Sequence, residues 1–376
     1  MSVRVLPAVV ASLVAVALAV LLFVPFVARE HRRRGELRPG TLLLFLAALL
    51  YALGLVAYVL VPLPPVAPGF CEVFGELEPQ WRPLAGFDGL RRPQHWMELT
   101  GLLADGSVQQ FGFNVLLFVP LGMFGRYLGR LSLPWTVLAG FAASLLVEVT
   151  QITGIWFLYP CPYRLFDVDD LLANTAGALA GAVAAPLLRL LPGQRSTADA
   201  GTPRPVTARR RLLGMSCDVL ALVWLGLIIG RGTQLALGAT GAQVPPGLGE
   251  LVESAALWLL PALVLLLVPL AGGGTTLGQR TVLLRTVAGD RSPGARAVLV
   301  RWLSGLGGLA LLEALANLVW PQAGAALAVL WCAAHAFGVL RTRNHRGISG
   351  RAAGTAVADA RPGDPADRTG SAAQHR

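Results

Sequence analysis

The sequence contains no lysine, and only 14% of its 376 residues are charged. A soluble domain of this length needs a larger share of charged residues to cover its surface. Apolar residues make up 55% of the chain, and the mean hydropathy is +0.61. These values exclude an ordinary soluble protein and predict one that is surrounded by lipid.

Cysteine is scarce as well, and the signature of nucleic-acid binding is missing. The four cysteines have neither the CxxC nor the Cys/His spacing of a metal site. The net charge is +10, but the arginines stand in short clusters between apolar runs, with no basic stripe interleaved with aromatic residues. We therefore expect no nucleic-acid partner and no cofactor.

Nine apolar runs are long enough to cross a bilayer as helices, which takes about 20 residues each. They lie at 6–28, 41–63, 111–128, 135–154, 169–191, 212–232, 251–271, 302–320 and 323–340. Only Pro321 and Gln322 separate the last two runs, which predicts a tight helical hairpin. The fold class that follows is all-α, a polytopic transmembrane bundle of about nine helices.

The arginine clusters decide the orientation of these helices. Arginines crowd the loops after the first, third, fifth, seventh and ninth runs, whereas residues 64–110 carry three arginines against six acidic residues. Cytoplasmic loops of membrane proteins carry the excess of positive charge. This places the N-terminus outside and the C-terminus in the cytoplasm, in a multi-pass protein of the cell membrane.

A polar, proline-containing segment divides the chain. Residues 192–210 are interpreted as a cytoplasmic linker between a five-helix module at 1–191 and a four-helix module at 211–358. The tail at 359–376 is polar and rich in alanine and glycine, so we expect it to be disordered.

The first module has polar residues at one predicted depth, the outer leaflet, although they come from three helices and a loop. They are Asn114, Glu148, Gln151, Arg164, Asp167, Asp169, Asp170 and Asn174. Polar groups inside a membrane are costly and need a reason. One interpretation is a pocket that binds an amphiphile's head group or a divalent cation. The other is a structural network that locks the bundle.

Three stretches of this module resemble the VanZ-like family. They are Asn114-Val-Leu-Leu-Phe-Val-Pro120-Leu-Gly122, Leu145-Leu-Val-Glu148-Val-Thr-Gln151 and Arg164-Leu-Phe-Asp167-Val-Asp169-Asp170-Leu-Leu-Ala-Asn174-Thr-Ala-Gly177. The resemblance covers about 40–190. It implies a role in the bacterial cell envelope and, through the family's namesake, resistance to teicoplanin-type glycopeptides. The insert at 159–163 departs from the family's shorter turn.

Small residues and cysteines in this module carry two further expectations. Gly177 and Gly181 form a Gly-xxx-Gly step, which favours close helix packing. Cys71 and Cys161 fall in predicted outer loops, where a disulfide is permitted, and a disulfide or two free thiols both stay open. Cys217 and Cys332 lie within helices and are expected to be buried thiols.

The second module has fewer polar residues within its helices: Arg211, Asp218, Glu313, Asn317 and His335. We interpret them as interhelical contacts, with Asp218 paired to Arg211 or Arg351, while a proton or ion path is the alternative. The segments 276–290 and 346–357 resemble the RDD family, membrane modules of unknown or varied function, over about 207–358. Gly350 stands where that resemblance predicts an aspartate, and Gln279 where a lysine is usual.

The leading hypothesis is a cell-envelope protein that modulates surface access or glycopeptide resistance through an outer-leaflet polar pocket. A secondary transporter of ions or small molecules is the alternative. A further alternative is a membrane enzyme acting on a lipid-linked cell-wall precursor by carboxylate acid/base chemistry, but the chain has no nucleophile–base set, so the sequence favours a non-catalytic protein. Expected partners are membrane lipids and either the lipid-linked precursor or the glycopeptide. Neither the metal nor the oligomeric state follows from the sequence.

Overall fold

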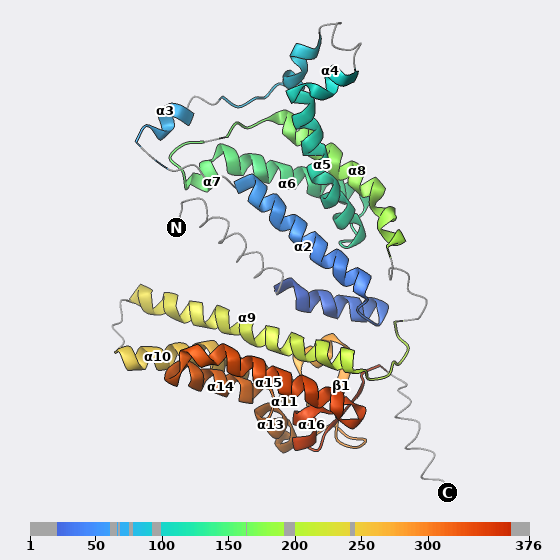
Figure 1. The fold of residues 1–376 in the computed structure, drawn as a ribbon, viewed down its shortest axis with the longest axis vertical. Helices are drawn as coiled ribbons and strands as arrows, with labels where there is room; N and C mark the ends of the chain where they lie inside the picture. The colour runs from blue at the N-terminus through green and yellow to red at the C-terminus, as the bar shows by residue number, and fades with distance from the viewer. Residues whose placement is uncertain are drawn as a thin grey trace. The chain divides into compact units, whose positions relative to one another are not determined.

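The computed structural model describes residues 21–60, 66, 68–74, 78–91, 99–162, 164–191, 200–240 and 245–361. The chain divides into two compact units (Figure 1). Unit 1 comprises residues 1–17 and 38–195, and unit 2 comprises residues 18–37 and 196–376. Residues 18–37, placed in the first module by the sequence, thus group with the second.

Seven helices among the described residues are long and apolar enough to cross a membrane, and a bent pair adds an eighth span if it is counted as one. They coincide with eight of the nine runs expected from the sequence. The remaining run, at 6–28, lies mostly outside the described residues. The chain is therefore a multi-pass membrane protein built mainly of helices, while the exact number of spans and the side on which each end lies stay predictions.

The described part of unit 1 has four long helices and several short ones. The long helices are α2 (Pro39–Leu60), α5 (Gly106–Tyr127), α6 (Leu133–Ile152) and α8 (Val168–Ala184), which the 3-10 helix η3 (Ala185–Leu190) continues. The short elements are α3 (Phe70–Phe74), η1 (Ala85–Arg91), α4 (Leu99–Ala104) and α7 (Gly154–Phe157). Asp105 begins α5 by accepting hydrogen bonds from the N–H groups of Ser107 and Val108.

Helices α5 and α8 lie side by side along most of their length (Figure 1). A Cβ atom added at Gly177 or Gly181 would overlap the carbonyl oxygen of Val115 or Val119 on α5. Small residues let helix backbones approach this closely in lipid. The Gly-xxx-Gly step thus packs helices within one chain.

Unit 2 contains a helical segment near the N-terminus, residues 21–34, together with the C-terminal helices. Its long elements are α9 (Ala208–Thr240), the consecutive α10 (Pro246–Ser254), η4 (Ala255–Leu259) and α11 (Leu260–Ala271), the bent pair α13 (Ala295–Leu303) and α14 (Leu306–Val319), and α15 (Pro321–Arg341). Its short elements are α12 (Leu277–Thr281), β1 (Leu284–Val287), η5 (Arg343–His345), α16 (Gly347–Ala352) and β2 (Ala356–Asp359). The hairpin expected from the last two apolar runs is confirmed, because α14 and α15 pack together across Trp320.

A widened π turn, η4, interrupts the span formed by α10 and α11. Proline has no N–H and its ring clashes with the carbonyl four residues earlier. For Pro261 that carbonyl belongs to Leu257, and it lies against Gly226 of α9, where a Cβ atom would overlap it. The turn therefore fits one helix closely against the next.

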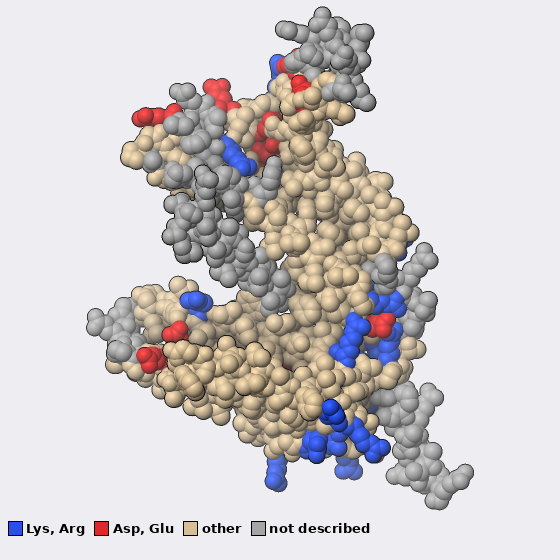
Figure 2. Space-filling view, viewed as in Figure 1, with Lys and Arg blue, Asp and Glu red and all other residues tan. Residues whose placement is uncertain are grey.

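Arginines gather at one end of unit 2, at the start of α9 and around the end of α15, whereas Glu250 and Glu253 lie at the other end, near the turn from α9 to α10 (Figure 2). Such a separation of charge along a bundle matches the excess of positive charge in cytoplasmic loops. It supports the predicted orientation.

A two-stranded antiparallel sheet closes this end of unit 2, with Leu284 opposite Asp359 and Val287 opposite Ala356. Asp359 was wrongly assigned to the disordered tail, since β2 ends on it and it is buried. Its Oδ2 atom accepts from Arg210 at 2.5 Å and from Arg361 at 2.9 Å. Arg361 also donates to the carbonyl of Gly35 at 3.0 Å. The composition of the tail could not predict this, because Arg210 and Gly35 lie far away in the sequence.

Burial alone would raise the pKa of Asp359. Hydrogen bonds from Arg210 and from the Arg361 N–H, together with the charge of Arg210, hold that pKa below its ordinary value. The ionised carboxylate is therefore the form that stabilises this end of unit 2.

We expect Gly181→Ala to lower the stability of unit 1 by about 1–3 kcal/mol, because the added methyl overlaps the α5 backbone. The matched control is Gly112→Ala on α5, where an added Cβ meets nothing within 4 Å. The measurement is thermal unfolding of the purified protein in detergent micelles. Equal stability of the two variants would contradict the packing described above.

The second prediction concerns Asp359→Asn. Removing the carboxylate leaves Arg210 buried without its counter-ion, so we expect a loss of about 3 kcal/mol at pH 7. Because the folded-state pKa is lowered, the stabilisation is present above the unfolded value and is lost as the pH falls through the folded value. The gap between wild type and variant should therefore shrink only below about pH 4. The exposed Asp290→Asn serves as control, and a gap of the same size in both variants would refute the assignment.

Candidate functional site

The polar residues expected at the outer leaflet gather at one end of unit 1. Helix α5 begins, α6 ends and α8 begins at this end. Acidic side chains collect there in the space-filling view (Figure 2). The elements therefore bring together residues that are up to 60 positions apart in the sequence, from Asn114 to Asn174.

Two of the aspartates hold a segment that the sequence did not connect with them. Asp167 caps α8 by accepting from the N–H of Asp169 at 2.8 Å, and it also accepts from the Gln80 side chain at 3.1 Å. The Asp169 carboxylate accepts from the N–H groups of Leu84 and Gly86, the latter at 3.3 Å. Both carboxylates therefore fix residues 80–86 to the start of α8.

The main chain strengthens the same attachment. The N–H of Gln80 donates to the carbonyl of Phe166 at 2.8 Å, and the N–H of Val168 donates back to Gln80 at 3.1 Å. The ring of Trp81 lies on that of Phe166, with 4.6 Å between centroids. Residues 80–86 are thus docked by backbone, ring and carboxylate together.

Three polar pairs join the helices below this segment: Glu148 with the N–H of Asp167 at 3.1 Å, Asn114 with the Asp170 carboxylate, and Asn174 with the Ser144 hydroxyl at 2.9 Å. Glu148 is only 1% exposed and Asn174 4%. Helices α5 and α6 are each connected to α8 in this way.

Arg164 does not join the network in the part of the chain that the structure describes. It is half-buried and forms no ion pair with the acidic residues there. Gln151 is buried on α6, less than one turn from Glu148. Burial raises the pKa of Asp167 above its ordinary value, and the charge of Asp169 adds to that shift. The acidic residues are therefore balanced by N–H donors instead of by a cation.

A metal ion finds no set of ligands in this cluster. Within the described ranges, no three His, Cys, Asp or Glu side chains are grouped as a metal ion requires. The carboxylate oxygens of Asp167 and Asp169 face N–H groups. Of the two interpretations of the sequence, a binding pocket and a structural network, the structural network is the one that predicts such contacts.

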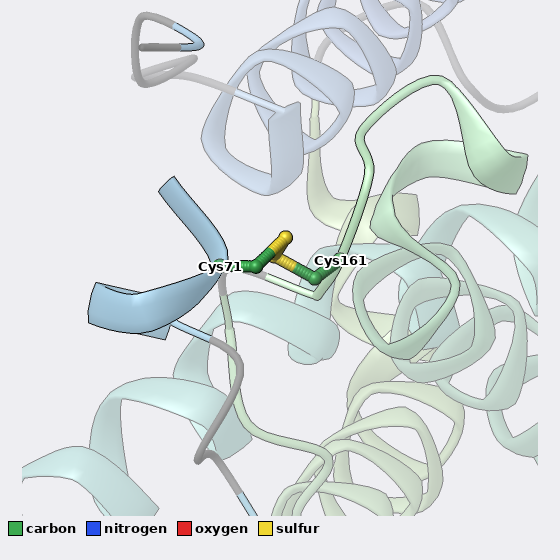
Figure 3. Close-up of a disulfide and its surroundings, with 2 residues drawn as sticks. All are labelled: Cys71 and Cys161. Atoms are coloured by element: carbon green, nitrogen blue, oxygen red, sulfur yellow. A yellow bond between two sulfur atoms is a disulfide. The ribbon is translucent and has the colours of Figure 1, made fainter. Parts of the chain in front are cut away.

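A disulfide between Cys71 and Cys161 ties α3 to the loop that precedes α8 (Figure 3). The rings of Phe70 and Tyr159 pack beside it, with 5.6 Å between centroids. Free thiols remain only at Cys217 and Cys332 among the described cysteines. The insert at 159–163 is thus part of a cross-linked corner.

The turn before this corner is left-handed over four consecutive residues. Gly154, Ile155, Trp156 and Phe157 have φ between 54° and 66°. This backbone is strained for side chains with a Cβ, and most of all for a β-branched residue such as Ile155. The result is an exposed apolar tip, with Trp156 57% and Phe157 82% exposed.

In unit 2, Asp218 forms no ion pair within 4 Å with Arg211 or Arg351 among the described residues, although it interacts electrostatically with Arg211. Asp218 accepts from the Thr276 hydroxyl at 2.7 Å and the Gly278 N–H at 2.6 Å, at the start of α12. Arg211 donates instead to the carbonyl of His345 at 3.2 Å. An N–H and a hydroxyl from the loop donate to the carboxylate, and the charges of Arg211 and Arg301 act on it without a direct hydrogen bond.

The other three residues singled out in unit 2 do not form one path. Glu313 is buried beside Gly324 of α15, while Asn317 is exposed. The two ring nitrogens of His335 lie 2.9 and 2.8 Å from the carbonyl oxygens of Trp331 and Ser304. Each of these residues contacts its own neighbours.

Comparison with known proteins adds a family for unit 1. Residues 45–189 match the VanZ/LLP1 family model. No curated protein and no solved structure matches the chain. The matched range runs from α2 to η3 and contains the whole polar cluster, so the likeness to the VanZ/LLP1 family covers the membrane helices of unit 1 that build this cluster. The RDD resemblance of 207–358 stays a prediction.

Sequence reasoning missed Gln80, Leu84 and Gly86. Leu84 and Gly86 contribute only backbone N–H groups, which leave no trace in residue type. The one available signal was the acidic excess of the loop at 64–110, which contains the segment.

We expect Asp169→Asn to release residues 80–86, since an amide offers one acceptor oxygen where the carboxylate offers two. Hydrogen exchange should show faster exchange of the Leu84 and Gly86 amides in the variant. Asp88→Asn is the matched control, because Asp88 forms an exposed ion pair with Arg82, and such pairs contribute little. Unchanged exchange in Asp169→Asn would contradict the network.

Proposed function

We propose that this chain is a protein of the bacterial cell membrane that modulates access to the cell surface and lowers susceptibility to teicoplanin-type glycopeptides. The observation that carries the proposal is the VanZ/LLP1 match, which covers the polar cluster and the helices that build it. The predicted orientation directs this end of unit 1 outward.

The polar cluster acts by holding a surface in place. Asp167 and Asp169 fix residues 80–86, and the disulfide fixes α3 to the loop after α7. A surface that is ordered before binding loses less conformational freedom when it meets a partner. This supports a preformed outer surface in place of the open pocket first considered.

The side chains that such a surface presents are aromatic. Trp81 is 63% exposed, and Trp156 and Phe157 are exposed on the left-handed turn. Tryptophan is enriched where a membrane meets water, because its ring is apolar and its N–H is polar. The proposed partner is accordingly an amphiphile at the membrane surface, whether a glycopeptide or a lipid-linked precursor.

A secondary transporter is the second candidate, because α13 and α14 form a span bent by 42°. Broken helices line the binding sites of many transporters, in matching positions of two halves. The bent pair has no counterpart among the described helices of unit 1. Substrate-dependent ion flux in proteoliposomes would support this candidate over the first.

Deletion of the chain should raise susceptibility to teicoplanin-type glycopeptides by more than the dilution step of the assay. Wild type should restore the original susceptibility, and the double variant Trp156→Ala/Phe157→Ala should not, because it removes the apolar tip.

The matched control is Leu187→Ala/Leu190→Ala, which removes exposed apolar side chains from η3 at the other end of unit 1. Immunoblots of membrane fractions check that all variants reach the membrane in equal amounts. If deletion leaves susceptibility unchanged, the resistance role is refuted. Full restoration by the tip variant would refute the role of the aromatic surface.

A further inference from the structure

Unit 2 contains a partly open cavity of about 460 Å³ between its helices. Most of the wall is apolar and comes from α9, α11, α13, α14 and α15, with Met215, Leu265, Trp302, Leu309 and Trp331 among its side chains. Cavities of this size hold small molecules or part of a larger one. Neither the VanZ match nor the proposed outer surface includes this site.

The charged residues of the wall do not balance. Arg211 and Arg301 line the cavity and are 3% and 7% exposed, and Asp218 is the one carboxylate among the lining residues. The two guanidinium groups and one carboxylate leave one positive charge. In a low-dielectric interior such a charge is costly unless an anion accompanies it.

Neighbouring groups do not supply that anion in the described part of unit 2. Arg211 donates to a backbone carbonyl, and Arg301 donates to the Thr355 hydroxyl at 2.8 Å. Neither forms an ion pair with a described carboxylate. Asp218 accepts from Thr276 and Gly278 and also acts on both arginines through its charge, but one carboxylate balances only one of the two.

Other lining groups are donors that lack an acceptor. The side-chain nitrogen of Gln279 and the indole nitrogen of Trp302 are buried and have no hydrogen-bond partner within the described residues. Buried donors of this kind are almost always satisfied in native proteins. These two nitrogens have almost no exposed surface, so the arginines are the groups of the wall that an oxyanion would pair with, through charge-assisted hydrogen bonds.

We propose that this cavity binds a monoanionic amphiphile. Its phosphate or carboxylate group lies between Arg211 and Arg301, and its apolar chain lies along Met215, Leu309 and Trp331. One negative charge neutralises the excess positive charge of the wall. A membrane supplies such molecules as anionic phospholipids and fatty acids, and the apolar wall favours them over a free inorganic anion.

Gly350 offers a way to alter this charge balance without removing an arginine. A Cβ atom added at Gly350 would lie 3.7 Å from Nη1 of Arg301 and 3.3 Å from the Thr355 carbonyl oxygen, so a small side chain fits with a slight shift. Gly350→Asp would place a carboxylate beside Arg301, and Gly350→Asn would place a neutral group of the same size there. Comparing the two variants therefore separates the effect of the added charge from the effect of the added volume.

The experiment measures ligand-dependent thermal stabilisation and native mass spectra of the full-length protein in a neutral detergent. The probes are phosphatidylglycerol, oleate, phosphatidylcholine and inorganic phosphate. Wild type should be stabilised by phosphatidylglycerol or oleate and retain it as a bound adduct, and phosphatidylcholine should have no such effect. Which of the two anionic lipids binds more tightly identifies the head group.

Two variant pairs locate the binding in the cavity. Gly350→Asp should weaken anionic lipid binding about tenfold or more, as expected for the loss of a charge-assisted contact, while Gly350→Asn should not. Arg301→Gln should weaken it likewise, and Arg296→Gln, an exposed arginine on the same helix, should not.

Three results would overturn the proposal: equal stabilisation by anionic and zwitterionic lipid, stabilisation by inorganic phosphate alone, or equal lipid binding by the two Gly350 variants. If Arg301→Gln does not fold, the wild-type lipid series and the Gly350 pair decide the matter by themselves.

Discussion

A charged or polar group that is buried in lipid or within the protein has no water to bind, so its partner has to come from the protein or from a ligand. Much of this structure depends on that constraint. Asp169 finds its partners in the N–H groups of residues 84 and 86, and Asp359 finds Arg210 and Arg361. Each carboxylate fixes a segment that no apolar helix face would hold, while the helices themselves pack through glycines such as Gly181.

The helices could be predicted from the sequence because their signal is local. A run of about 20 apolar residues is sufficient to indicate a span, and eight such runs have helices in the described chain. The close approach of α8 to its neighbour at Gly177 and Gly181 could be predicted as well, since small residues four positions apart share one helix face. Such features depend on residues a few positions apart, so the pattern of residue types is sufficient to predict them.

The site could be predicted only in part, because its contacts are not local and often involve the backbone. The predicted depth in the membrane was sufficient to group Asn114, Glu148 and Asp170, which do form hydrogen bonds at one end of unit 1. Residues 80–86 were missed, since the acids bind their N–H groups, which every residue but proline has. The hydrogen bonds of Asp218 were missed for a related reason. Asp218 shares a helix face with Arg211, which lies seven residues earlier and acts on it by charge, but its direct donor Thr276 lies 58 residues away in a loop.

The two units therefore differ in how their buried charges are balanced. In unit 1 the carboxylates and their N–H donors form a network that holds residues 80–86 and includes no cation among the described residues. In unit 2, Arg210 is neutralised by Asp359, but Arg211 and Arg301 share a cavity with one occupied carboxylate. A buried cation can be retained without a protein counter-ion only if something else supplies the charge. The glycine at 350, beside Arg301, leaves room for that charge to come from outside the chain.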